Sequence, residues 1–222
     1  MIRKNAPEPA ATATAGESLK PRTRDRSATE ARILDAAQAI LTETGPAGFG
    51  VNAVARAAGT DKQLIYRYFG GLDGLLEALG DRIAVWWQQV MRDEAPGPPP
   101  ADYAALIERM TLRLLHILRT EPLALQSALW ELTDTSGLVR ALSASRSRAL
   151  GAWMETTRGD LKPPEGVDAP AVNAMIIAAL SYLVLASRTS DTVIGLPTDH
   201  PETWRRIEDA VTKLVRTAYG SG

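Results

Sequence analysis

Apolar residues recur every three or four positions along most of the chain, a spacing that places them on one face of an α-helix. Stretches with a helical pattern occupy residues 72–94, 103–118, 121–132, 137–157, 168–188 and 200–219. No segment has the strict alternation of apolar and polar residues that is typical of a half-buried strand. The pattern therefore predicts an all-α protein of about nine helices, three short ones followed by about six longer ones.

The first 26 residues lack this periodicity. They are polar and rich in alanine, threonine and proline, so we expect residues 1–26 to form a disordered arm. The end of this arm, KPRTRDR (20–26), has four cations and one acid. Such a segment fits a solvated tail, or an arm that contacts phosphates or a minor groove through Arg22, Arg24 and Arg26. Composition alone does not separate these two alternatives.

Three helices are expected after this arm. Ser27 and Glu30 have the spacing of a capping box, which predicts that the first helix begins at Ser27. Gly45-Pro46 is expected to end that helix, because proline cannot continue it. The remaining boundaries are a helix at 51–58 closed by Gly59, and a helix at 62–69 that Asp61 caps and Gly70-Gly71 ends.

The third of these helices has two chemically different faces. Ile65 and Phe69 point to one side of a helical wheel, whereas Gln63 and Arg67, one turn apart, point to the other. Glutamine suits bidentate pairing with adenine and arginine with guanine, and the hydroxyl of Tyr66 beside them suits a phosphate oxygen. Two short helices joined by a glycine-containing turn, the second presenting such a face, predict a helix-turn-helix at about residues 50–69. A solvated helix in a bundle that does not bind DNA is the alternative.

The stretch TEARILDAAQAILTETG…VNAVARAAGTDKQLIYRYFGGLDGLLEAL (29–79) resembles the N-terminal domain of the TetR family of transcriptional regulators. The resemblance depends on ILDAA in the first helix, VA..AG in the second and K..(L/I)Y.YF in the third. It implies a DNA-binding domain at 27–71 and a larger helical domain for effector binding and dimerisation at 72–222. It also implies DNA contacts from Lys62, Gln63, Leu64, Tyr66 and Arg67, with Ile65 and Phe69 in the core.

The sequence departs from the family pattern at three places. Phe49-Gly50 stands where the second helix usually begins with a threonine pair that caps it and touches phosphate, and we expect Asn52 to substitute. Gln63 stands where a small residue is usual, so the base preference of the family does not transfer. Leu72 stands where the fourth helix commonly has a lysine on the DNA backbone. We expect Arg67 and the basic arm to make up for that lysine.

Tryptophans in the middle helices are the candidate walls of an effector pocket, because apolar pockets are often lined by aromatic side chains. The candidates are Trp86, Trp87, Trp130 and Trp153, with His116 as a hydrogen-bonding group. Each tryptophan also fits plain core or interface packing, and His116 also fits a solvated or inter-helix position. The expected effector is a small, largely apolar molecule.

The helix at 168–188 is apolar nearly all round, so both of its faces need to be covered. The resemblance implies that the last two long helices pair with those of a second copy in a homodimer. Small residues on one helix and an apolar stripe on the other would form this interface: Ala174, Ala178 and Ser181, with Trp204, Ile207, Val211 and Leu214. A central helix in a monomeric bundle is the alternative.

Composition narrows the chemistry. The chain has no cysteine and two histidines, which excludes disulfides and thiolate sites and disfavours a histidine metal site. We expect no metal, no cofactor and no catalytic residue, and an enzyme is the less favoured class. The most apolar run, 171–186, is shorter than the ~20 residues of a membrane span, so we expect a cytoplasmic protein without a membrane contact. The predicted function is a ligand-responsive repressor that binds a near-palindromic operator as a dimer; a helical ligand-binding or adaptor module without DNA activity is the alternative.

Overall fold

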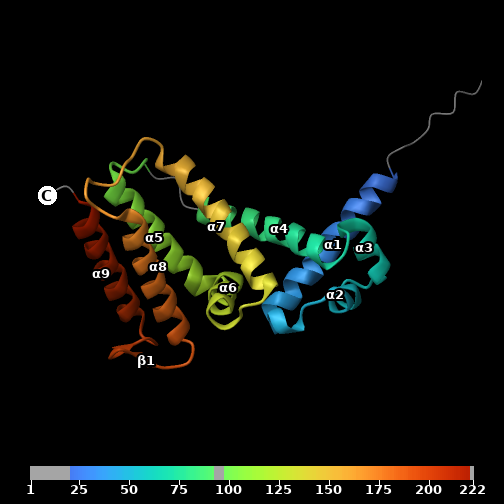
Figure 1. Ribbon diagram of the computed structural model, residues 1–222. Coiled ribbons are helices and arrows are strands. Elements are labelled where there is room, and N and C mark those ends of the chain that lie inside the picture. The colour runs from blue at the N-terminus through green and yellow to red at the C-terminus, as the bar shows by residue number, and fades with distance from the viewer. Residues whose placement is uncertain (1–20, 93–97, 221–222) are drawn as a thin grey trace, which may run out of the picture.

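A computed structural model describes residues 21–92 and 98–220 (Figure 1). Nine α-helices lie within these ranges, which confirms the predicted all-α class. They are α1 (Pro21–Thr44), α2 (Val51–Ala57), α3 (Lys62–Phe69), α4 (Leu72–Arg92), α5 (Tyr103–Thr120), α6 (Pro122–Thr133), α7 (Gly137–Arg158), α8 (Ala169–Ala186) and α9 (Pro201–Tyr219). A short 3-10 helix, η1 (Pro46–Gly48), precedes α2, and one antiparallel hairpin, β1 (Thr192–Val193) with β2 (Leu196–Pro197), joins α8 to α9. The sequence did not predict this hairpin.

The first helix begins earlier than predicted. α1 starts at Pro21, so Ser27 lies inside the helix and does not cap it. Proline is tolerated in a first turn, and the turns that follow are held by side chains one turn apart. Thr29 Oγ1 donates to the backbone oxygen of Asp25 at 2.8 Å, and Arg26 forms an ion pair with Glu30 at 2.8 Å. The end of the expected disordered arm is therefore helical, and residues 1–20 lie outside the described ranges.

The N-terminal domain, α1 to α3, packs around a small apolar core. Its fully buried members are Ile33, Ala37 and Leu41 from α1, Val54 from α2 and Ile65 from α3. Leu75 and Leu79 of α4 belong to the same cluster, so the N-terminal domain is sealed by a helix that continues into the rest of the molecule. Packing on this core stabilises α3, because a helix of eight residues gains little from its own hydrogen bonds.

The larger domain contains two groups of packed helices. In one group α4 packs along α7, and in the other α5 packs against both α8 and α9. Figure 1 shows α4 running from beside α3 into the larger domain, while α8 and α9 form the edge of the molecule farthest from α3. α4 is therefore shared between the helix-turn-helix and the larger domain.

Candidate nucleic-acid interface and ligand pocket

Helix α3 presents a polar edge to solvent. Lys62, Gln63 and Arg67 are exposed, and Tyr66 is 56% exposed. On the opposite side Ile65 is fully buried and Phe69 is half-buried against the core, with Leu64 half-buried on the flank. Four of the residues predicted to contact DNA therefore share one accessible surface, and Leu64 lies half-buried at its flank.

Both ends of α3 are fixed as the sequence predicted. The side chain of Asp61 accepts a hydrogen bond from the backbone N–H of Gln63 at 2.8 Å, and Gly70 leaves the helix in the left-handed conformation with φ of 77°. Gly71 follows with φ of 123°, and a Cβ at this position would lie 3.4 Å from the ring of Tyr66. A larger residue at Gly71 would be strained by this backbone conformation, and its Cβ would contact the ring of Tyr66, so Gly70 and Gly71 together allow the chain to turn from α3 into α4.

An arginine at the start of α1 extends the polar edge of α3. The guanidinium of Arg26 lies 5.3 Å from the ring centroid of Tyr68, and that of Arg67 lies 5.5 Å from the same ring. A cation over an aromatic face is attracted by the ring quadrupole. Tyr68, on the recognition helix, thus contacts a cation from α1 and a cation from its own helix. The side chains of Arg22 and Arg24, from the same predicted arm, lie outside what the structure describes.

Two of the three departures from the family pattern lie at the starts of α2 and α4. Asn52 is exposed in the first turn of α2, where Gly50 is the N-cap and no side chain from the described residues caps the helix. Leu72, the first residue of α4, is 39% exposed. Asn52 therefore does not replace the missing threonine pair as a cap, and its contact with phosphate stays a prediction, whereas Leu72 exposes an apolar group at the start of α4.

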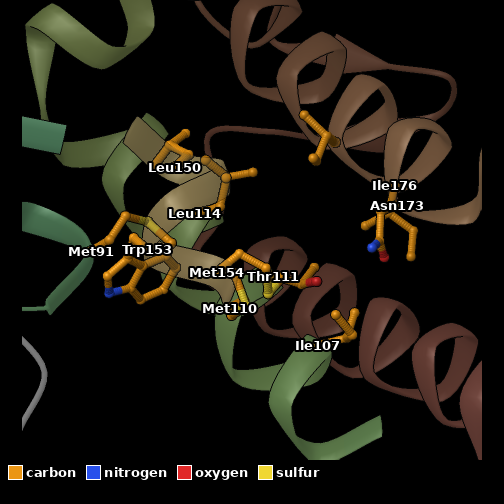
Figure 2. Close-up of a pocket in the computed structure, with 12 residues that line it drawn as sticks. Met91, Ile107, Met110, Thr111, Leu114, Leu150, Trp153, Met154, Asn173 and Ile176 are labelled. Carbon is orange, nitrogen blue, oxygen red and sulfur yellow. The ribbon is translucent and has the colours of Figure 1, made fainter. Parts of the chain in front are cut away.

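A cavity of about 230 Å³ lies in the larger domain between α5, α7 and α8 (Figure 2). Met91, at the end of α4, closes one side of it. The wall is formed by Met91, Ile107, Met110, Thr111, Leu114, Leu150, Gly151, Trp153, Met154, Asn173, Ile176 and Ile177. Among the residues that the structure describes, no charged side chain lines the cavity. Its wall is therefore mainly apolar.

Of the residues predicted for an effector pocket, only Trp153 lines this cavity. Trp87 and Trp130 are buried in the core, and Trp86 packs edge-on against Trp87 with ring centroids 5.2 Å apart. His116 is exposed on a separate polar groove beside Arg119 and Trp204. The other four residues lie elsewhere, so a role for them in effector binding stays a prediction, and tryptophans serve as readily in core packing as in cavity walls.

The methionines of this cavity were not predicted from the sequence. Met91, Met110 and Met154 come from three different helices, so no spacing along the chain connects them. Methionine is flexible and polarizable and adapts to irregular shapes, which makes it common at surfaces that accept varied ligands. Three methionines that converge on one space are the informative feature, and it is visible only after folding.

Few polar groups reach the cavity wall. Besides the indole of Trp153 they are the hydroxyl of Thr111 and the carboxamide of Asn173. The hydroxyl of Tyr219, on α9, donates to Asn173 Oδ1 at 2.8 Å and lies 3.2 Å from the backbone oxygen of Ala169. Burial raises the pKa of Tyr219 to about 12, so the phenol keeps its proton at neutral pH. Because the amide oxygen is occupied, the amide N–H groups of Asn173 remain as donors.

The apolar stripe of α9 is turned inward. Trp204, Ile207 and Val211 are buried within the protomer, where α9 packs on α5, so the prediction that they lie at a dimer interface is corrected. An amphipathic stripe predicts that a helix is covered but not what covers it. Leu214, the fourth α9 residue of that prediction, is 63% exposed.

Helix α8 keeps an exposed apolar face. Ala174 and Ala178 are exposed and Ser181 is half-buried, and their interface role stays a prediction. Met175, Ile177 and Tyr182 are exposed beside them, at 65%, 49% and 56%. Large apolar residues at this exposure form a patch of the kind that marks an interaction surface. We call Ala174, Met175, Ile177, Ala178 and Tyr182 the α8 face.

Fold and site together define a helix-turn-helix protein: a three-helix domain with an exposed polar recognition edge, joined through α4 to a helical domain that holds an apolar cavity. Comparison with known proteins gives the family. Residues 33–79 match the family model described as bacterial regulatory proteins, tetR family. This match confirms, for the helix-turn-helix domain, the resemblance to the TetR family that was seen in the sequence.

Individual relatives agree with this assignment. An uncharacterised HTH-type transcriptional regulator of Mycobacterium tuberculosis is 30% identical over 161 residues, which cover 72% of this chain and 63% of the relative. The chain thus spans less than two thirds of that relative's length. An HTH-type transcriptional repressor of Streptomyces coelicolor is 26% identical over 78% of this chain and 86% of its own. The solved structure of a TetR-family member from Streptomyces coelicolor shares the fold, with a TM-score of 0.56, 20% identity, and coverage of 87% of this chain and 99% of its own.

Proposed function

We propose that the protein is a cytoplasmic, homodimeric transcriptional repressor that binds a near-palindromic operator and releases it when a small molecule fills the cavity. The observation that carries the proposal is the exposed Gln63–Arg67 edge of a rigid α3. The names of the relatives, a transcriptional regulator and a transcriptional repressor, support regulation and repression.

Base reading is assigned to the two side chains one turn apart on α3. Gln63 and Arg67 both reach outward, and an α-helix fits the major groove of B-DNA. Arginine pairs bidentately with guanine and glutamine with adenine, and each good pair discriminates by about 1–3 kcal/mol. Lys62 and Tyr66 flank them and suit phosphate oxygens, which fix the register but carry no sequence information.

A second copy of the chain is proposed to cover the α8 face. Of the 18 residues of α8, 17% are fully buried in the protomer, although the helix is apolar enough by length and composition to cross a membrane. Association with a second copy by a two-fold axis would bury this face on both protomers. It would also place two recognition helices about 34 Å apart, one turn of DNA, as a near-palindromic operator requires.

The cavity is proposed to hold a neutral, mostly apolar effector with one hydrogen-bond acceptor. An apolar cavity of about 150 Å³ holds a benzene molecule, so a volume of about 230 Å³ suits a somewhat larger molecule. A charged ligand would be buried without a partner, which costs a large free energy. The free amide donors of Asn173 suit a carbonyl or ether oxygen of the ligand.

Helix α4 is proposed to connect the two sites. Met91 at its C-terminal end lines the cavity, whereas Leu75 near its start lies in the core that supports α3. A bound effector changes operator affinity only if it prefers one arrangement of α4 over the other. Regulation therefore depends on whether the filled cavity fits the DNA-bound arrangement.

The proposal is tested by selecting bound sequences from random duplex DNA with the purified full chain. The expected result is enrichment of a near-palindrome whose half-sites are centred about one helical turn apart. A library that stays random after repeated rounds in dilute buffer would remove DNA binding and leave a helical ligand-binding or adaptor module. Enrichment of an asymmetric site would keep DNA binding and contradict the homodimer.

A further inference from the structure

The hairpin between α8 and α9 has an unusual residue at its tip. Val193 of β1 pairs with Leu196 of β2, so the turn consists of Ile194 and Gly195 alone. Both have positive φ, 49° for Ile194 and 76° for Gly195. Two-residue hairpin turns of this kind favour Asn-Gly or Asp-Gly, because asparagine and aspartate tolerate the left-handed conformation. A β-branched residue there is an outlier and is strained.

The base of the hairpin is fixed. Thr198 donates twice, from its backbone N–H to Asp191 O at 2.9 Å and from its hydroxyl to Ser190 O at 3.0 Å. Trp204 Nε1, from α9, donates to the backbone oxygen of Thr198 at 3.0 Å, and Val193 is buried. The tip is therefore presented by a rigid support, which lowers the entropy cost of any contact it makes.

Ile194 contributes almost nothing to the packing of its own protomer. Its side chain is 83% exposed, the highest value among the large apolar residues of the described chain. The position thus combines backbone strain with an apolar side chain in water, and both disfavour isoleucine in an isolated protomer. A contact outside the protomer would offset both.

We propose that Ile194 docks on a second copy of the chain, so that the hairpin acts as an apolar clasp at the end of the dimer interface. This inference rests on the homodimer of the proposed function. Figure 1 shows the hairpin projecting beside the ends of α8 and α9, at the same edge of the molecule as these two helices. In a two-fold interface each protomer uses the same surface, so the clasp would occur twice.

The nearest source of a partner surface is the α8 face itself. Met175, Tyr182 and, on α9, Leu214 are exposed apolar residues of the two helices that the hairpin connects. A second copy offers the same residues again, so Ile194 has an apolar surface to meet. A lipid surface is less suited, because the segment 187–200 carries Asp191 and Asp199 against one arginine, Arg188, and anionic membranes attract cations.

The test replaces Ile194 with residues that the turn prefers. Ile194→Asn and Ile194→Gly relieve the backbone strain, so the thermal midpoint, measured at a dilution where the proteins are monomeric, should stay equal or rise. If the tip is a clasp, the dimer dissociation constant from sedimentation equilibrium should rise about tenfold or more in both variants. Leu132→Gln is the matched control, because Leu132 is also highly exposed, at 73%, but lies on α6. The control should dimerise as the unchanged protein does.

Each other outcome is distinct. Dimers of both variants as tight as the unchanged protein, with raised thermal midpoints, would overturn the clasp while leaving the homodimer in place. An unchanged protein that stays monomeric at all concentrations would overturn the homodimer and the clasp together. Flotation of the unchanged protein with phosphatidylserine vesicles, lost on Ile194→Asn while dimerisation is unaffected, would assign the tip to a membrane and overturn the proposal.

Discussion

The guanidinium of Arg146, on α7, lies over the indole ring of Trp87, on α4, 5.7 Å from its centroid. The same guanidinium forms an ion pair with Glu131, on α6, at 2.5 Å. Trp130, the residue before Glu131, packs close to Gly45, which follows the end of α1. A Cβ built on Gly45 would lie 3.4 Å from the indole nitrogen of Trp130. The larger domain thus reaches the N-terminal domain through a second route besides α4, and three helices meet at one arginine.

We expect Arg146→Met to lower the free energy of unfolding by about 1–2 kcal/mol, since it leaves Glu131 without its partner in a site where the two side chains are only 20% and 29% exposed. It should also weaken the effect of effector on operator affinity, because Trp87 and Met91 are one turn apart on α4. Urea denaturation and operator titrations with and without effector measure the two. Arg148→Met, at an exposed arginine of the same helix, is the control. Equal effects at both positions would argue against a coupling role.

Variants of α3 should affect operator binding in two different ways, through base preference or through overall affinity. Arg67→Ala and Gln63→Ala should each weaken operator binding by about 1–3 kcal/mol and relax the preference at one base pair. Lys62→Ala should weaken binding to all sequences alike and reduce the slope of log K against log salt by about one. Fluorescence anisotropy with operator and scrambled duplexes distinguishes the patterns. Loss of affinity without loss of base preference in Arg67→Ala would move that residue to the phosphates.

Arg26 should contribute to DNA affinity through charge. Arg26→Ala is expected to lower affinity several-fold and to flatten the salt dependence, because one cation beside the recognition helix is removed. This variant is cleaner than removing residues 1–26, since α1 begins at Pro21 and truncation would cut into a helix. Arg32→Ala serves as control, because Arg32 is an exposed arginine on a different side of α1. An unchanged salt slope in Arg26→Ala would place Arg26 outside the interface.

The cavity should select against charge. Octan-2-one is expected to raise the thermal midpoint, whereas octanoate at pH 8 should not, because no charged residue of the described wall could pair with its carboxylate. Differential scanning fluorimetry at matched concentrations compares the two. Equal stabilisation by octanoate would contradict the neutral class of ligand.

Gly151 offers a way to fill the cavity without loss of stability. Gly151 lies inside α7. A Cβ built on it would have no neighbouring atom of the described residues within 4 Å, so there is room for a side chain. Gly151→Ala should therefore raise the free energy of unfolding by about 0.5–1 kcal/mol. Gly151→Leu should retain the gain while occupying the cavity, and so abolish the shift caused by octan-2-one. A preserved shift in Gly151→Leu would show that the ligand binds elsewhere.

Tyr219 should make stability depend on alkaline pH. Burial raises its pKa in the folded protein to about 12 from an ordinary value of 10.0, so its contribution is complete below pH 10 and is lost as pH rises toward 12. Tyr219→Phe should remove this part of the pH dependence. It should also cost about 1 kcal/mol at pH 7, because Asn173 loses its donor. Urea midpoints of both proteins at pH 7, 10 and 11.5 give the comparison, and parallel curves would contradict it.

Local signals predicted the N-terminal domain well. The Asp61 cap, the Gly70 exit and the inward Ile65 depend on residues within one or two turns, so spacing alone predicts them. The start of α1 was wrong because Ser27 offers a capping pattern that the preceding turn overrides with its own side-chain pairs. The cavity could not be predicted, since its wall comes from four helices and depends on how they pack.

The face that each long helix buries was predicted only in part. The stripe of α9 was recognised, yet Trp204 and Val211 proved to pack on α5 of the same protomer. The surplus apolar surface of α8 was a better guide, because a helix that is apolar nearly all round has more surface than one neighbour covers. The strained turn at Ile194 gave no sequence signal, since Ile-Gly is not a typical turn pair.

The continuity of α4 has a mechanical consequence. Its 21 residues make a rod of roughly 31 Å, with Met91 near one end and Leu72 at the other. If the rod pivots near the cavity by about 5°, the far end travels about 3 Å, close to the rise of ~3.4 Å between neighbouring base pairs. A small displacement of α4 at Met91 can therefore shift α3 along the DNA by about one base-pair step.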